Sequence, residues 1–219
     1  MAFGPLRVLR GRALFDGLKR MILIAGLGNP GARHARNRHN VGFMALGAIA
    51  AVHRIGPFRA RFQGLVADGV LGATRAALLM PQTYMNESGR SVGEAMRFYK
   101  LGLSSVIVIH DELDLAPAKV RVKVGGGNAG NNGVRSVSAH NGNDFKRVRI
   151  GIGHPGDKAL VHPYVLGDFF KEEMRWVEAV CDAIARAADL LANGADASFQ
   201  NRVHLAIEAA GFAGKGDAP

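Results

Sequence analysis

Short apolar runs alternate with segments of helical periodicity along most of this chain, and this alternation limits the fold more than any other feature. Apolar runs at residues 22–25, 76–80 and 106–109 alternate with helical patterns at residues 41–53 and 92–101. This order is typical of a parallel sheet covered on both faces. Three further strand patterns would make the sheet mixed: residues 61–67, 119–124 and 148–152. We therefore expect a single-domain α/β fold with a mixed, mostly parallel twisted sheet flanked by helices on both faces.

The domain boundaries follow from local composition. A chain of 219 residues with 48% hydrophobic residues can bury one sizeable core. Residues 1–20 are basic and weakly amphipathic, and we interpret them as an N-terminal extension or an upstream start. Residues 21–211 would form the domain, and residues 212–219 a flexible tail. Within the domain, apolar residues recur at helical spacing from Asp168, as N-cap, to Gly194, which predicts a long helix.

The charge balance favours an anionic partner such as nucleic acid. Lys and Arg number 28 against 18 Asp and Glu, which gives a net charge of +10. No acidic residue lies between Asp16 and Asp68, so the first third should carry a positive field. The single cysteine, Cys181, excludes an intramolecular disulfide and a thiolate zinc site, which fits a reducing cytoplasm. No apolar run approaches the roughly 18 residues of a membrane-spanning helix, so we expect no membrane partner.

Polar side chains follow two of the predicted strands. Asn29 lies in the glycine-rich turn after the first strand, and Asp111 follows the run 106–109. The carboxyl ends of neighbouring parallel strands meet in one crevice, so both could share a site with His39. A carboxylate that holds one imidazole nitrogen leaves the other to take a proton from water. The spacing alone leaves three interpretations open: a solvated strand-to-loop junction, a His39–Asp111 base, and a divalent metal site in the run 110–114.

Several familiar motifs are excluded. The turn Gly-Leu-Gly-Asn-Pro-Gly at 26–31 matches a dinucleotide fingerprint, but Pro30 disturbs it and no acidic residue before Asp68 could bind a ribose. A phosphate-binding P-loop and a G-x-S-x-G nucleophile are also missing. The polar runs 81–89 and 125–133 each follow a strand and precede a helix. They present amide groups to a ligand, or they serve only as turns.

Taken together, these runs resemble the bacterial-type peptidyl-tRNA hydrolase family over roughly residues 21–204. Six motifs carry the resemblance in order at compatible spacings: GLGNPG, RHNVGF, PQTYMNESG, HDELDL, GGGNAGNNG and RVRIGIGHPG. The resemblance implies hydrolysis of the ester that joins a peptide, or an N-blocked aminoacyl group, to the 3′-terminal ribose of tRNA. The tRNA is thereby freed for reuse in translation. No metal or cofactor is implied, and we expect a cytoplasmic monomer.

The resemblance also implies roles for residues at matching positions. His39 would be the general base that activates water, and Asp111 would hold it in its basic form. Asn29 resembles the residue that senses whether the aminoacyl nitrogen is blocked. Asn86 resembles the residue that binds substrate near the scissile ester, and Asn132 the one that orients peptide or water. We also expect Asn86 or a nearby backbone N–H group to stabilise the oxyanion.

The chain departs from the family pattern at three positions around these residues. His34 stands where tyrosine is usual, Asn37 where threonine is usual, and Asn131 where the loop commonly has histidine before Asn-Gly. Tyr84 resembles an aromatic contact to the tRNA end, and His34 would be a weaker stacking contact. Since the base and its partner remain, we expect activity with an altered peptide pocket.

Basic residues alternate along two predicted strands and so share a face of each. They are Lys119, Arg121 and Lys123 on one strand and Arg147 and Arg149 on the other. We expect Lys123 and Arg149 to contact phosphates near the acceptor end of tRNA, against the alternative of a solvated strand face. The altered loop and the basic extension keep a second function open. This is a non-catalytic RNA-binding member of the same fold, similar to the chloroplast intron-splicing factor related to the family.

Overall fold

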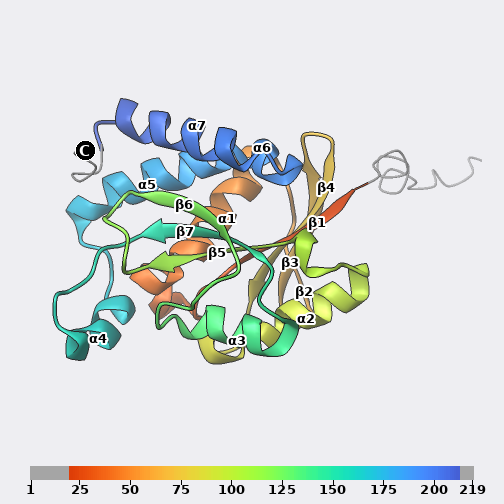
Figure 1. Cartoon of the computed structure of the whole chain (residues 1–219), viewed down its shortest axis with the longest axis horizontal. Helices are drawn as coiled ribbons and strands as arrows, with labels where there is room; N and C mark the ends of the chain where they lie inside the picture. The colour runs from red at the N-terminus through yellow and green to blue at the C-terminus, as the bar shows by residue number, and fades with distance from the viewer. Residues whose placement is uncertain (1–19, 213–219) are drawn as a thin grey trace, which may run out of the picture.

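The computed structural model describes residues 20–212, and in it one seven-stranded sheet lies between two layers of helices (Figure 1). The predicted extension lies outside the described residues except for Arg20, and the predicted tail except for Phe212. The strands are β1 (Met21–Gly26), β2 (Arg59–Arg61), β3 (Gly64–Leu71), β4 (Thr74–Pro81), β5 (Val106–Glu112), β6 (Val120–Val124) and β7 (Lys146–Gly151). The helices are α1 (Val41–Val52), α2 (Ser88–Tyr99), α3 (Asn132–Asn141), α4 (Val161–Leu166), α5 (Lys171–Arg186), α6 (Ala188–Asn193) and α7 (Asp196–Ala209). Short 3-10 turns are η1 (Ala32–His34), η2 (Arg38–Asn40), η3 (Met85–Glu87), η4 (Leu103–Ser105) and η5 (Lys158–Leu160).

The strand order is β2-β3-β4-β1-β5-β7-β6. The four central strands, β4, β1, β5 and β7, are parallel to one another, whereas β2, β3 and β6 add antiparallel pairs at the two edges. Every residue of β5 is buried, which explains its apolar run because a central parallel strand is covered on both faces. The predicted mixed α/β sheet is confirmed.

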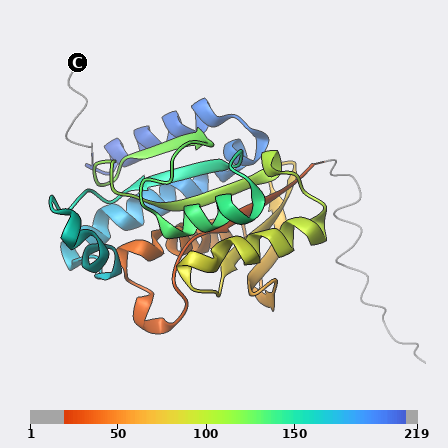
Figure 2. The ribbon, with the colours of Figure 1, turned by 60° about the horizontal axis from the view of Figure 1, so that its bottom comes forward.

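The two faces of the sheet carry separate hydrophobic cores. Ile107 and Ile109 of β5 pack in the larger core, with α1, α5, α6 and α7. Val106 and Val108 pack in the smaller core, beneath α2 and α3, which lie side by side (Figure 2). The chain passes from β1 to β4 through α1 on one face and from β4 to β5 through α2 on the other. Strand order therefore changes direction at β1, and such a point opens a crevice at the carboxyl ends of the strands.

The single strand predicted over residues 61–67 is wrong, because this segment is a hairpin. β2 ends at Arg61, and Phe62 and Gln63 form the turn with left-handed φ angles of 56° and 49°. Such a turn usually contains Asn or Gly, so the sequence gives no signal for it. The Phe62 ring packs 5.1 Å from the Phe98 ring and the Arg61 guanidinium lies over both rings, which compensates for the unfavourable backbone conformation.

The long helix predicted from Asp168 to Gly194 is also wrong in part. Helix α5 begins at Lys171, and Ala187 interrupts the helical conformation between α5 and α6. Helix α6 is followed by Gly194 in the left-handed conformation, as expected. Asp168 does not cap the helix, because its carboxylate accepts a hydrogen bond from the Asn37 side chain instead. Apolar periodicity continues across the break since both helices face the same core.

Candidate active site

A cavity of about 850 Å³ opens at the carboxyl ends of β1, β4 and β5. Its lining brings together six of the predicted site residues: Asn29, His39, Tyr84, Asn86, Asp111 and Asn132. The opposite wall comes from residues 154–166. His34, Lys123 and Arg149 do not line this cavity. The structure thus brings most of the predicted site residues to one side of the cavity, whereas no site residue was predicted in the wall at 154–166.

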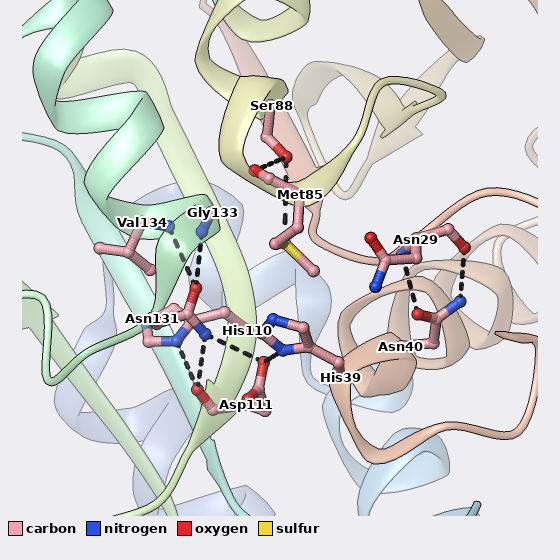
Figure 3. Close-up of polar contacts among 10 residues, drawn as sticks. All are labelled: Asn29, His39, Asn40, Met85, Ser88, His110, Asp111, Asn131, Gly133 and Val134. Carbon is pink, nitrogen blue, oxygen red and sulfur yellow. Dashed lines mark hydrogen bonds and ion pairs between the residues drawn. The ribbon is translucent and has the colours of Figure 1, made fainter. Parts of the chain in front are cut away.

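His39 and Asp111 form a buried pair in this cavity. His39 lies in η2, one turn before α1, and its Nδ1 is 2.8 Å from Asp111 Oδ1 (Figure 3). Because a carboxylate accepts, Nδ1 carries the proton in neutral His39, and Nε2 presents its lone pair. Burial alone would lower the pKa of His39, but the charge of Asp111 and the hydrogen bond raise the pKa above its usual value. Burial acts against ionised Asp111, yet His39 holds the pKa of that carboxyl below its usual value.

Close backbone contacts at Gly26 and Gly42 bring His39 and Asp111 together. A Cβ on Gly26 would lie 2.4 Å from Gly42 O, and a Cβ on Gly42 would lie 2.4 Å from Ile109 O. The first turn of α1 therefore rests directly on the backbone of β1 and β5, where Leu27 N donates to Ile109 O. Gly26, the first glycine of the apparent dinucleotide fingerprint, serves close packing rather than phosphate binding.

Asn40 fixes the turn that carries Asn29. Its Oδ1 accepts from Asn29 N at 2.8 Å, and its Nδ2 donates to Asn29 O at 2.9 Å (Figure 3). The carboxamide pairs with this residue much as a neighbouring strand would, so the Asn29 side chain is held at the cavity. The sequence did not predict that Asn40 would fix the backbone of Asn29, although Asn40 follows His39 directly in the motif.

The turn η3 carries Asn86 and is held in a similar way. The Ser88 hydroxyl donates to Met85 O at 2.9 Å, and Met85 is buried against the smaller core (Figure 3). Asn86 itself is exposed at the cavity, and Tyr84 is 75% exposed at its rim. Both side chains are therefore accessible to a substrate.

Asn131 links Asp111 to helix α3. Its Nδ2 donates to Asp111 Oδ1 at 3.0 Å and to Asp111 O at 3.3 Å. Its Oδ1 accepts from Gly133 N at 3.0 Å and from Val134 N at 3.1 Å, so Asn131 is the N-cap of α3 (Figure 3). The sequence marked this position only as a departure that would alter the peptide pocket. A functional contact to Asp111 was not predicted.

His110 supports the same strand end from the neighbouring position. It is fully buried, and its Nδ1 donates to Asp111 O at 2.7 Å. Burial, aided by the charges of Arg147 and Arg149, lowers the pKa of His110 to about 4 against the opposing effect of Asp111. His110 is therefore neutral at physiological pH and adds no charge beside the pair.

Four of the five predicted basic residues lie on the paired strands β6 and β7, whereas Lys119 precedes β6. Arg121 is opposite Arg149, and Lys123 is opposite Arg147, across the β6–β7 pair. Lys123 is exposed, and Arg149 is partly exposed with Nη1 3.8 Å from Glu112 Oε2.

Arg147, which was predicted to share a strand face with Arg149, is buried. It is only 2% exposed and donates to Gly126 O, Gly127 O and Asn143 Oδ1. Its guanidinium therefore supports the glycine-rich loop, because a buried charge needs hydrogen-bond partners.

His34 lies outside the cavity with both ring nitrogens engaged. Its Nδ1 is 2.8 Å from Asn37 Oδ1, and its Nε2 accepts from Arg33 Nε at 2.9 Å. The ring is partly buried in η1, and a stacking contact to tRNA stays a prediction.

The cavity wall is bonded to the segment that carries His39. Arg38 N donates to Gly167 O at 3.0 Å, and Phe169 N donates to Arg36 O at 3.0 Å. Asn37 and Asp168 form the bridge between these two bonds. Asn37, another departure from the family pattern, thus connects the segment that carries His39 to the cavity wall.

Arg38 reinforces this connection from inside. Its guanidinium lies 4.4 Å from the Tyr164 ring centre, donates to Asp168 O at 2.7 Å and pairs with Glu173. Glu173 also accepts from Phe170 N at the start of α5. Sequence reasoning gave Arg38 no role, and its burial beside His39 could not be read from a motif that also fits a surface arginine.

A divalent metal site in the run 110–114 was one of the interpretations left open by the sequence. Within residues 20–212, no group of three or more His, Cys, Asp and Glu side chains is arranged to hold a metal ion. In the same part of the chain, no helix combines the length and apolar character needed to span a bilayer.

Comparisons with known proteins agree on one family. The family model described as Peptidyl-tRNA hydrolase matches residues 23–210. The peptidyl-tRNA hydrolase of Methylorubrum populi is 69% identical over 192 residues, which cover 88% of this chain and 91% of that protein. The peptidyl-tRNA hydrolase of a Bradyrhizobium species is 61% identical over 90% of this chain and 98% of its own. The crystal structure of peptidyl-tRNA hydrolase from Acinetobacter baumannii superposes with a TM-score of 0.79 and 38% identity over 84% of this chain and 94% of that one.

Proposed function

Because the chain belongs to the peptidyl-tRNA hydrolase family, we propose that the His39–Asp111 pair activates the water molecule of its reaction. The reaction is the hydrolysis of peptidyl-tRNA, and tRNA is part of the substrate. One observation carries the proposal: the 2.8 Å hydrogen bond from His39 Nδ1 to Asp111 Oδ1 in the cavity wall. It leaves Nε2 as the only ring nitrogen that can accept a proton.

In the proposed first step, His39 Nε2 takes a proton from water while the water oxygen adds to the ester carbonyl carbon. The imidazolium that forms is stabilised by the ionised Asp111 carboxylate. The tetrahedral intermediate then collapses and breaks the bond to the ribose 3′ oxygen, which takes the proton from His39. The products are a peptide with a free carboxyl group, which loses its proton to solvent at neutral pH, and a tRNA with a free 3′ hydroxyl.

The amide side chains around the pair would orient the ester. Asn29, Asn86 and Asn132 line the cavity with His39, and each offers donor and acceptor atoms. We assign recognition of the blocked nitrogen to Asn29, contact with the substrate near the ester to Asn86, and orientation of peptide or water to Asn132. An Asn86 amide or a nearby backbone N–H would stabilise the oxyanion, an effect worth about 10²–10³ in kcat per donor in other enzymes.

The tRNA would leave the cavity past its basic edge. Tyr84 at the rim offers a ring on which a base can stack, and Lys123 and Arg149 lie on the neighbouring strands β6 and β7. The net charge of +10 supports binding of an anionic partner such as tRNA. We propose that the protein acts as a monomer in the cytoplasm, where translation supplies the substrate.

A single assay tests the mechanism: release of N-blocked aminoacyl groups from tRNA with EDTA present. We expect full activity with chelator and its loss in His39→Ala. Activity that requires an added metal ion would refute the water-activation mechanism. The intact His39–Asp111 pair and the hydrolase relatives argue against the alternative of a non-catalytic RNA-binding protein.

A further inference from the structure

We propose that Asn131 is a positioning residue for hydrolysis, because one carboxamide fixes both the Asp111 carboxylate and the first turn of α3. The inference rests on the proposed roles of His39 and Asp111. It concerns a position where the chain departs from its family pattern, so its side chain cannot be assigned from the motif alone. Both ends of the amide are used, and each end has a different task.

The donor end restrains the catalytic carboxylate. Asp111 Oδ1 accepts from His39 Nδ1 at 2.8 Å and from Asn131 Nδ2 at 3.0 Å. A carboxylate oxygen has two lone pairs, and here they meet donors from η2 and from the loop before α3. The two donors fix the rotation of the carboxylate, so the imidazole ring is held in one orientation.

The acceptor end organises the substrate side of the cavity. The first N–H groups of a helix have no partner within the helix, and Asn131 Oδ1 supplies one to Gly133 N and Val134 N. Asn132 lies between the cap and these bonded groups, and its side chain lines the cavity. The same side chain that restrains Asp111 therefore places Asn132.

The amide also affects the basicity of His39. A neutral donor to Asp111 stabilises the carboxylate charge, and this weakens the electrostatic stabilisation that the carboxylate gives to protonated His39. Loss of the donor should therefore raise the pKa of His39 and move the acid limb of the pH–rate profile to higher pH. The other titratable groups around the pair and the cavity are Tyr84, His110, Glu112, Asp114, Arg135, Arg149, His154, Lys158 and His162. An amide, unlike these groups, keeps its state at every pH.

The decisive variant is Asn131→Ser. Serine is a good N-cap, so α3 should keep its first turn, but its side chain is too short to reach Asp111. We expect kcat to fall at least about tenfold, because one charge-assisted hydrogen bond is lost. KM for N-blocked aminoacyl-tRNA should stay within about twofold of the wild-type value. The acid limb should move up by about half a pH unit to one unit. Asn131→Ala removes the cap as well and should also lower the thermal unfolding midpoint.

Asn193→Ser is the matched control. The Asn193 carboxamide accepts from Thr74 Oγ1 at 2.9 Å at the start of β4, the end of the sheet opposite the cavity. This variant also loses a side-chain hydrogen bond. It should lower the unfolding midpoint while kcat and the acid limb stay unchanged.

Three results would overturn the proposal. Wild-type kcat and an unmoved acid limb in Asn131→Ser would mean that Asn131 only caps the helix. A raised KM with unchanged kcat would make it a direct substrate contact. An equal loss of kcat in Asn193→Ser would assign the effect to general destabilisation. His39→Ala, measured in parallel, separates this test from the proposed function: activity retained there would refute the general base itself.

Discussion

The contact of Gly42 with the sheet can be tested by two identical changes in one helix, Gly42→Ala and Gly47→Ala. Both replace a glycine of α1, and both gain about 0.5–1 kcal/mol of helix propensity. A Cβ at Gly47 meets nothing within 4 Å, so this variant should be more stable than the wild type by that amount. Since the propensity gain cancels in the comparison, the difference between the variants isolates the clash at Gly42.

The clash at Gly42 involves backbone atoms that cannot rotate away. The added Cβ would lie 2.4 Å from Ile109 O, 2.5 Å from Leu27 O and 2.6 Å from Leu27 N. Relief to 3.0 Å requires a shift of at least about 0.6 Å at the start of α1. Overpacking of this kind costs about 1–3 kcal/mol, and three backbone contacts favour the upper end. The same shift would lengthen the bond from His39 to Asp111, and misplacements near 1 Å cost up to about 10²-fold in rate.

Urea unfolding and kcat/KM measurements on both variants provide the test. We expect Gly47→Ala to unfold at higher urea concentration with unchanged kcat, and Gly42→Ala to lose about 2–3 kcal/mol relative to it together with at least tenfold in kcat. Equal free energies of unfolding for the two variants would refute the packing argument. A destabilised Gly42→Ala with wild-type kcat would refute the link between α1 and the alignment of His39.

Three further perturbations address the site. Asp111→Asn should lower kcat by about 10²–10⁴. Because the Asp111 carboxylate raises the pKa of His39, its loss should also move the acid limb of the pH–rate profile to lower pH. An acid limb that moves to higher pH or does not move would contradict this expectation. Arg38→Met should cost about 2–3 kcal/mol in urea unfolding, since it removes the buried partner of an ion pair and leaves the partly exposed Glu173 unpaired; a loss below 1 kcal/mol would show that Glu173 contributes little. Neutralising Lys123 and Arg149 together should raise KM for peptidyl-tRNA and flatten its salt dependence without loss on a minimal ester, and equal loss on both substrates would exclude phosphate contacts.

The sequence predicts the centre of this fold better than its edges. The central strands are recognisable because burial on both faces requires continuous apolar runs, as in β5. The hairpin at Phe62 and Gln63 escapes prediction because its left-handed turn is stabilised by distant aromatic packing rather than by turn residues. Asp168 likewise has the composition of a helix cap, yet its tertiary contact with Asn37 prevails.

The site shows the same division. Spacing and resemblance predict that motif residues such as His39 and Asp111 lie together, and the structure places them in one cavity. The residues that position these side chains cannot be identified in the same way. Asn40 and Asn131 hydrogen-bond to backbone groups, which any asparagine could do, so only the fold determines which asparagine makes such a contact. Arg147 illustrates the reverse error, since strand alternation predicts a shared face and says nothing about burial.

The bonds between residues 36–38 and 167–169 couple the position of the cavity wall to the position of His39. Separating the two segments would break two backbone hydrogen bonds and strip the buried Arg38 of its partners, at a cost of about 3–5 kcal/mol. At tenfold per 1.4 kcal/mol, such a separated state would occur roughly once in 140 to once in 4,000 molecules. In that state His39 would lose the anchor beside it, so an opened site would be an inactive site. Under the proposed mechanism, a base in correct alignment would then be found only in molecules whose cavity wall is in place.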